Sequence, residues 1–153
     1  MTLNDYAALS ARVYNDARDP VNRNPRPPGW EEIAYTSDLT NSLFTGGFTA
    51  GAYKNSETGE IVIAYKGTDF LYGTNSGQSN ADWLANFGLG IGVGSSQALA
   101  AARFYAEIKA ANPDANITFT GHSLGGGLAS IMSVWFNRPA TVFAEAPFEP
   151  TAV

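Results

Sequence analysis

The chain has 153 residues, of which 44% are hydrophobic and 15% are charged, and its formal net charge is -5. This length suits a single domain with a core, and the scattered Lys and Arg residues form no basic stripe, so nucleic acid is excluded as a partner. The chain contains no cysteine, which excludes disulfides, thiolate metal sites and a cysteine nucleophile, and we expect no metal and no other cofactor.

The N-terminal segment predicts a helix. Thr2 and Asp5 form a capping pair, and apolar residues follow at nearly helical spacing: Leu3, Tyr6, Leu9, Val13 and Tyr14. The segment lacks the pattern of a secretory signal, and no stretch reaches the roughly 20 apolar residues of a membrane span. We therefore expect no integral membrane segment and a cytoplasmic location by default, with export by a route without a cleavable signal left open.

The next part of the chain predicts a surface connection and a hairpin. Residues 15–30 contain four prolines, which disfavour helix. Residues 48–53 and 61–65 are rich in aromatic and β-branched residues and are separated by a polar turn, so they predict an antiparallel pair of strands. Strand 61–65, with the sequence IVIAY, is apolar enough to be central.

A glycine-bearing middle region follows. Residues 70–80 predict a polar loop that could border a pocket, and residues 81–87, ADWLANF, predict a short helix. Residues 88–94 contain alternating glycines, but no strand precedes them and their spacing differs from that of a dinucleotide-binding loop. We interpret them as a pliable connection.

The second half of the chain alternates helices and strands. We expect a helix at 95–111, ended by Asn112-Pro113, a strand at 116–120, a helix at 123–136 and a strand at 140–144. Such alternation predicts an α/β fold: a mostly parallel sheet with an antiparallel N-terminal hairpin and helices on both faces.

The strand and helix on either side of Ser123 carry the main chemical signal, the sequence GHSLG. Gly121 and Gly125 allow a very sharp turn, in which the serine adopts a strained conformation that aims Oγ outward. The following helix directs its positive end at the site, and the Leu124 amide would face a tetrahedral oxyanion. We predict that Ser123 is a nucleophile. A phosphate-binding loop would need a GK[ST] ending, which is absent.

These residues belong to three blocks that resemble the class 3 lipase family, the fungal-type lipase branch of the α/β-hydrolases. The blocks occur in the family's order: IVIAYKGTD at 61–69, ADWLANF at 81–87 and TGHSLGGGLAS at 120–130. The resemblance implies a partial α/β-hydrolase fold. It also implies an enzyme that hydrolyses carboxylic esters of lipids through an acyl-enzyme on Ser123.

The resemblance also implies a second oxyanion group, Thr68, which would act opposite Leu124 through its N-H and hydroxyl. Two donors from separate loops suit a developing alkoxide, although a hydroxyl that stabilises its own turn is the alternative for Thr68. Tyr65-Lys66 replaces the family's more usual Phe-Arg. Asp82 is interpreted as a helix cap or buried hydrogen-bond partner.

The rest of a catalytic triad does not follow Ser123. In this fold an acid and then a histidine come later in the chain, but the single histidine is His122, which as a neighbour of Ser123 would project elsewhere. We interpret His122 as a structural part of the turn, and Glu145, at the end of the last strand, as a solvated or capping carboxylate. Residues 1–153 are thus expected to be one α/β-hydrolase domain that is incomplete at its C-terminus.

Three hypotheses remain open. The first is a lipase or esterase acting on a lipid or small ester, with the acid and base supplied by a further C-terminal segment or a second polypeptide. The second is a non-catalytic remnant that binds a lipid, an acyl group or a protein partner. The third is a truncated gene.

Overall fold

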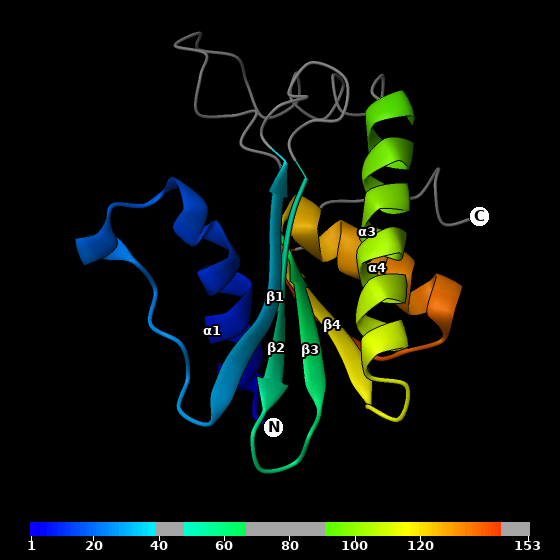
Figure 1. Ribbon diagram of the computed structural model, residues 1–153. Coiled ribbons are helices and arrows are strands. Elements are labelled where there is room, and N and C mark those ends of the chain that lie inside the picture. The colour runs from blue at the N-terminus through cyan, green and yellow to red at the C-terminus, as the bar shows by residue number, and fades with distance from the viewer. Residues whose placement is uncertain (39–47, 67–90, 145–153) are drawn as a thin grey trace, which may run out of the picture.

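The computed structural model describes residues 1–38, 48–66 and 91–144 (Figure 1). Its elements are α1 (Leu3–Arg12), the 3-10 helices η1 (Val13–Ala17) and η2 (Pro20–Asn22), β1 (Trp30–Asp38), β2 (Phe48–Asn55), β3 (Ile61–Tyr65), α3 (Ile91–Ala111), β4 (Ile117–His122), α4 (Leu124–Phe136) and β5 (Ala140–Phe143).

The strands form one five-stranded sheet in the order β1-β2-β3-β4-β5. The pairs β1/β2 and β2/β3 are antiparallel, whereas β3/β4 and β4/β5 are parallel. Because β3 and β4 run in parallel, both end at the same edge of the sheet, and the chain beyond each strand starts from that edge. The predicted α/β class, with an antiparallel start before parallel strands, is confirmed.

Helices cover both faces of this sheet, as predicted. In Figure 1, α1 lies on one face and α3 and α4 lie on the other. Parallel strands need this double cover because both of their faces are apolar, and all five residues of β3 are buried.

Helix α1 begins with the predicted capping box. The Asp5 amide donates to the Thr2 hydroxyl at 3.3 Å, and the Thr2 amide donates to the Asp5 carboxylate at 2.7 Å. Leu9 and Val13 are fully buried and pack against the sheet, in a cluster with Trp30, Tyr53, Val62 and Ala64. Leu3, in contrast, is 65% exposed, so the apolar face of the helix is shorter than its sequence pattern indicates.

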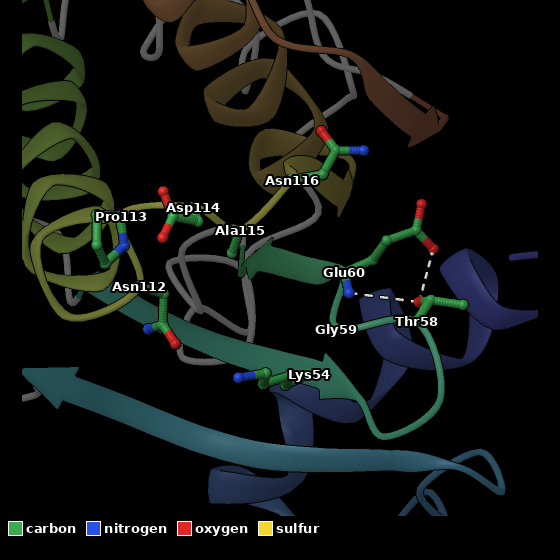
Figure 2. Close-up of a pocket in the computed structure, with 9 residues that line it drawn as sticks. All are labelled: Lys54, Thr58, Gly59, Glu60, Asn112, Pro113, Asp114, Ala115 and Asn116. Atoms are coloured by element: carbon green, nitrogen blue, oxygen red, sulfur yellow. Dashed lines mark hydrogen bonds between the residues drawn. The ribbon is translucent and has the colours of Figure 1, made fainter.

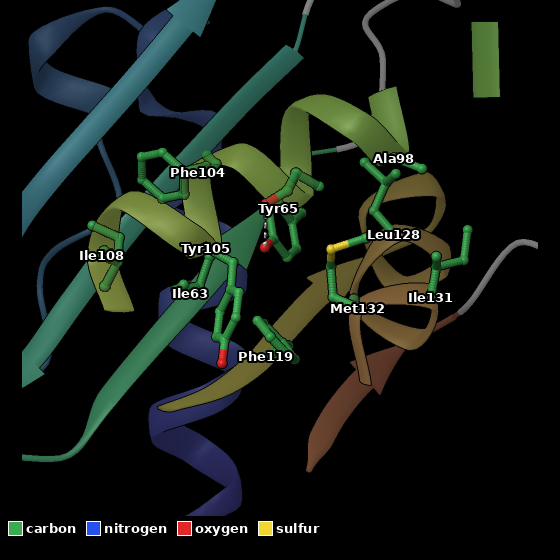
Figure 3. Packing of buried hydrophobic residues seen from close by; sticks show 14 of the residues in the cluster. Ile63, Tyr65, Ala98, Phe104, Tyr105, Ile108, Phe119, Leu128, Ile131 and Met132 are labelled. Atoms are coloured by element: carbon green, nitrogen blue, oxygen red, sulfur yellow. Dashed lines mark hydrogen bonds between the residues drawn. The ribbon is translucent and has the colours of Figure 1, made fainter. Parts of the chain in front are cut away.

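The larger core lies on the other face, between the sheet and helices α3 and α4 (Figure 3). The Tyr105 ring of α3 packs 5.4 Å from the ring of Phe119 on β4 and 4.2 Å from that of Phe136 on α4. The Tyr65 hydroxyl on β3 donates to the Ala101 carbonyl at 3.2 Å, which satisfies its polar atom inside this core. Sheet and helices are therefore held together by one aromatic layer.

Two predictions of local structure are wrong. The sequence interpretation contained no strand at β1, and it placed the start of α3 at residue 95, whereas the helix begins at Ile91. Residues 91–94 are therefore helical and not part of a pliable connection. The predicted loop at 70–80 and helix at 81–87 lie outside the described residues.

Candidate active site

The candidate nucleophile lies where β4 turns into α4. Strand β4 ends at His122, α4 begins at Leu124, and Ser123 between them has φ 56° and ψ -120°. A non-glycine residue with positive φ is strained, and such strain is concentrated at functional sites. The bend that the sequence predicts at Ser123 is present.

Gly121 shows why this turn requires glycine. A Cβ atom at this position would overlap the carbonyl group of Gly125 and approach the Gly126 nitrogen to 2.7 Å. Backbone atoms cannot move aside as a flexible side chain can, so any side chain at Gly121 would separate the strand from the helix. Gly125 is itself buried, and the two glycines let the helix start directly against the strand.

The backbone of Ser123 is held from two sides. Its amide donates to the Phe143 carbonyl of β5 at 3.0 Å, and its carbonyl accepts from the Gly127 amide of α4 at 3.1 Å. Its hydroxyl, however, makes no capping bond to the first turn of α4, unlike that of an ordinary N-cap serine. The backbone of the half-buried Ser123 is therefore held by β5 and α4, while its hydroxyl is not used to cap α4.

Three amides at the start of α4 face the same end of the helix. The N-H groups of Leu124, Gly125 and Gly126 precede the first intrahelical bond, so they have no partner within the helix. Together with the helix dipole they favour negative charge next to Ser123. The Leu124 amide, the predicted oxyanion donor, is thus one of the amides without a partner inside the helix. Thr68, the predicted second donor, lies outside the described residues.

His122 faces Tyr14 on η1. The two rings meet edge to face with centroids 6.5 Å apart, and the Tyr14 hydroxyl donates to the His122 carbonyl at 3.4 Å. His122 thus contacts Tyr14, which packs against the same cluster as Leu9 of α1, whereas a Cβ at Gly121 would meet the backbone of α4. His122 is an exposed residue, and its structural role stays a prediction. Glu145 lies outside the described residues.

Lys66 completes this group of contacts at the end of β3. Its side chain is buried, with 3% exposure, and its ammonium lies 5.5 Å from the centroid of the Tyr14 ring. Its backbone amide donates to the Thr49 carbonyl of β2 at 3.0 Å. Sequence reasoning assigned Tyr14 only to the apolar face of a helix, and no local signal could have paired it with residues 52 and 108 positions away.

A surface hollow of about 430 Å³ is shown in Figure 2. It is lined by the turn between β2 and β3 and by the loop between α3 and β4, with Lys54, Glu60 and Asp114 as its charged residues. Glu60 and Asn116 precede β3 and β4, whereas Ser123 follows β4. The hollow and the candidate nucleophile therefore occupy opposite ends of the sheet.

No group of three or more His, Cys, Asp or Glu residues among residues 1–38, 48–66 and 91–144 could hold a metal ion. None of the helices described in those ranges combines the length and hydrophobicity that crossing a bilayer would need.

Comparisons with known proteins show to which family the chain belongs. An extracellular phospholipase A1 of Serratia liquefaciens is 37% identical over 103 residues, which are 65% of this chain and 28% of the phospholipase. Two solved structures share the fold: the Lip2 lipase of Yarrowia lipolytica (TM-score 0.60, 16% identity) and a lipase of Rhizopus microsporus var. chinensis (TM-score 0.51, 16% identity). They cover 93% and 92% of this chain.

The chain spans 58% and 55% of those two lipases, so it corresponds to little more than half of each. The resemblance to the fungal-type lipase branch of the α/β-hydrolases is confirmed. The model of the Tle-like phospholipase domain matches residues 5–153, nearly the whole sequence, and the chain therefore belongs to the Tle-like phospholipase domain family.

Proposed function

We propose that this chain carries the nucleophile and one oxyanion donor of an enzyme that cleaves carboxylic esters of lipids. The observation that carries the proposal is the backbone of Ser123, which has φ 56° and ψ -120° at the turn from β4 into α4. This conformation is costly for serine, and a nucleophile that must project from a sheet edge gives a reason for it.

In the proposed reaction, Ser123 Oγ attacks the ester carbonyl carbon and forms a tetrahedral intermediate. Its negative oxygen accepts a hydrogen bond from the Leu124 amide at the positive end of α4, and Thr68 would supply a second donor. The C-O bond to the leaving alcohol then breaks, and the alcohol departs with the proton that a base took from Ser123. Water hydrolyses the resulting acyl-enzyme by the same steps.

The base in this scheme would be a group other than His122. His122 is the only histidine of the sequence, and its ring packs on Tyr14. We therefore propose that the base and its acidic partner come from a further C-terminal segment or from a second polypeptide. Without them, the oxyanion donors and substrate binding alone would leave a residual acceleration of roughly 10³ to 10⁴ over water.

Labelling with a p-nitrophenyl alkyl phosphonate tests the proposal directly, because the reagent forms a bond to an activated serine and releases nitrophenol. This chain alone supplies the oxyanion donors without the base, so we expect slow but specific labelling. One alkylphosphonyl group should appear on Ser123 of the wild-type chain, located by peptide mass spectrometry, and none on Ser123→Ala. Ser130→Ala is the matched control, since Ser130 is a half-buried serine two turns further along the same helix, and it should be labelled like the wild type.

Two outcomes would count against acyl transfer. Equal labelling of Ser123→Ala would show that another residue reacts, and no labelling of the wild type would show that the hydroxyl is not activated in this chain. In the second case the packing of His122 on Tyr14 favours the other function considered above, binding of a lipid or acyl group without catalysis. Binding of the unlabelled chain to phosphatidylcholine vesicles would then measure that function.

A further inference from the structure

The end of the β3/β4 ladder is held by a side chain. The parallel register of these strands runs from Ile61↔Ile117 to Tyr65↔Gly121, and no further pair continues it. The next residue of each strand, Lys66 and His122, instead contacts Tyr14 on the face covered by α1. Tyr14 thus contacts both strands where the β3/β4 pairing ends, one residue before the strained Ser123.

The contacts of Tyr14 differ in kind and reach both strands. Its ring receives the buried Lys66 ammonium at 5.5 Å and the edge of the His122 ring at 6.5 Å. Its hydroxyl donates to the His122 carbonyl at 3.4 Å. Attraction of a cation to a ring face is strengthened when water is excluded, and Lys66 is 3% exposed.

The elements next to Tyr14 are anchored to the sheet. Val13, its neighbour, is fully buried, and the Val13 carbonyl accepts from the Tyr35 hydroxyl of β1 at 3.3 Å. About two helical turns before Val13, the Tyr6 hydroxyl is hydrogen-bonded to the Thr118 hydroxyl of β4 at 3.0 Å. These two contacts attach α1 and η1 to the sheet, and so they hold the backbone that carries Tyr14 beside the ends of β3 and β4.

We propose that Tyr14 is a positioning residue that links the end of β3 to the end of β4 and so maintains the conformation of Ser123. The effect of Tyr14 on the reaction rests on the proposed function. Its effect on the conformation of the turn does not, because that conformation can be measured without a reaction at Ser123. Tyr14 contacts the residues that precede both predicted oxyanion donors. Lys66 lies two residues before Thr68, and His122 lies two residues before Leu124.

The first test is amide hydrogen exchange of Tyr14→Phe, which keeps the ring and removes the hydroxyl. The probes are the Ser123 and Gly127 amides, which are hydrogen-bonded to Phe143 and Ser123 respectively. We expect both to exchange about tenfold faster than in the wild type, because the turn opens more often.

Tyr6→Phe is the matched control, because it also removes one tyrosine hydroxyl between α1 and β4 but acts four residues before His122. It should leave exchange at Ser123 and Gly127 within about twofold of the wild type. If Tyr14→Phe and Tyr6→Phe change these two amides equally, the proposal is overturned, whatever the labelling rates are.

The second test measures the reaction. With the phosphonate, Tyr14→Phe should lower the maximum labelling rate of Ser123 about tenfold, and Tyr14→Leu, which also removes the ring, should lower it about a hundredfold, with little change in the apparent affinity for the reagent. A loss of affinity with an unchanged maximum rate would contradict a positioning role. If the wild type is not labelled at all, the proposed function fails, while the exchange experiment still decides whether Tyr14 maintains the turn.

Discussion

Gly121 is the residue whose replacement should damage the turn most directly. In Gly121→Ala the new methyl group would overlap the Gly125 carbonyl, so strand and helix must separate. Overpacking of this kind costs roughly 1 to 3 kcal/mol or more. We expect a loss of at least about 2 kcal/mol in the free energy of unfolding, measured by urea denaturation, together with loss of phosphonate labelling.

Gly59→Ala is the control for Gly121→Ala, because it introduces backbone strain without steric overlap. Gly59 has φ +73°, but a Cβ atom there would meet nothing within 4 Å. Its replacement should therefore cost only the roughly 1 to 2 kcal/mol of a left-handed residue and leave labelling intact. Equal labelling of Gly121→Ala and Gly59→Ala would refute the argument for a glycine requirement at the turn.

The turn at Ser123 could be predicted from the sequence, because the glycines on either side of Ser123 are required by the local geometry of the bend. A sharp strand-to-helix bend leaves no room for a Cβ at Gly121, so GHSLG predicts the bend from sequence alone. The contacts of Tyr14 have no such local cause. They join η1 to the ends of two strands, and only the assembled sheet brings Lys66 and His122 to the same ring.

Helix α1 gives a test at the scale of an element. Its sequence pattern places Leu3 and Leu9 on one apolar face, but Leu9 is fully buried and Leu3 is 65% exposed. Leu9→Ala should lower the free energy of unfolding by roughly 2 to 5 kcal/mol, whereas Leu3→Ala should change it by less than about 0.5 kcal/mol. Urea denaturation of the two variants side by side measures the difference, and similar losses would contradict the described packing of α1.

The two elements that sequence reasoning misjudged have identifiable causes. Strand β1 contains a register shift between Glu32 and Ala34, and as the edge of the sheet it exposes Ile33 and Tyr35 by 36% and 38%. A bulge and exposed apolar residues both interrupt the alternation by which a strand is recognised. In α3, Gly92 and Gly94 each cost about 1 kcal/mol of helix propensity, so the sequence favours a later start than Ile91.

At the scale of the whole molecule, two buried phenols make stability depend on alkaline pH. Burial raises the pKa of both Tyr53 and Tyr65 above the usual range. Below about pH 10 these phenols are protonated in the folded and unfolded states alike, so their contribution to stability is fully present. As the pH rises toward the raised pKa values, only the unfolded chain ionises, and the free energy of unfolding falls.

Each phenol should contribute a decline of up to about 1.4 kcal/mol per pH unit in that window. Urea denaturation at a series of pH values above about 10 measures the slope. Tyr65→Phe removes one of the two groups, so its decline should be shallower than that of the wild type. An identical slope in the variant would mean that Tyr65 ionises as readily in the folded chain as in the unfolded one.

The separation of the surface hollow from Ser123 has a practical consequence. The loop at residues 112–116 borders that hollow at the far end of the sheet, and Asp114 within it is exposed. Since the sequence has no cysteine, a single thiol introduced by Asp114→Cys would be a unique anchor for coupling to a solid support. Immobilised in this orientation, the protein would turn its serine toward the surrounding solution, where an emulsion droplet could reach it.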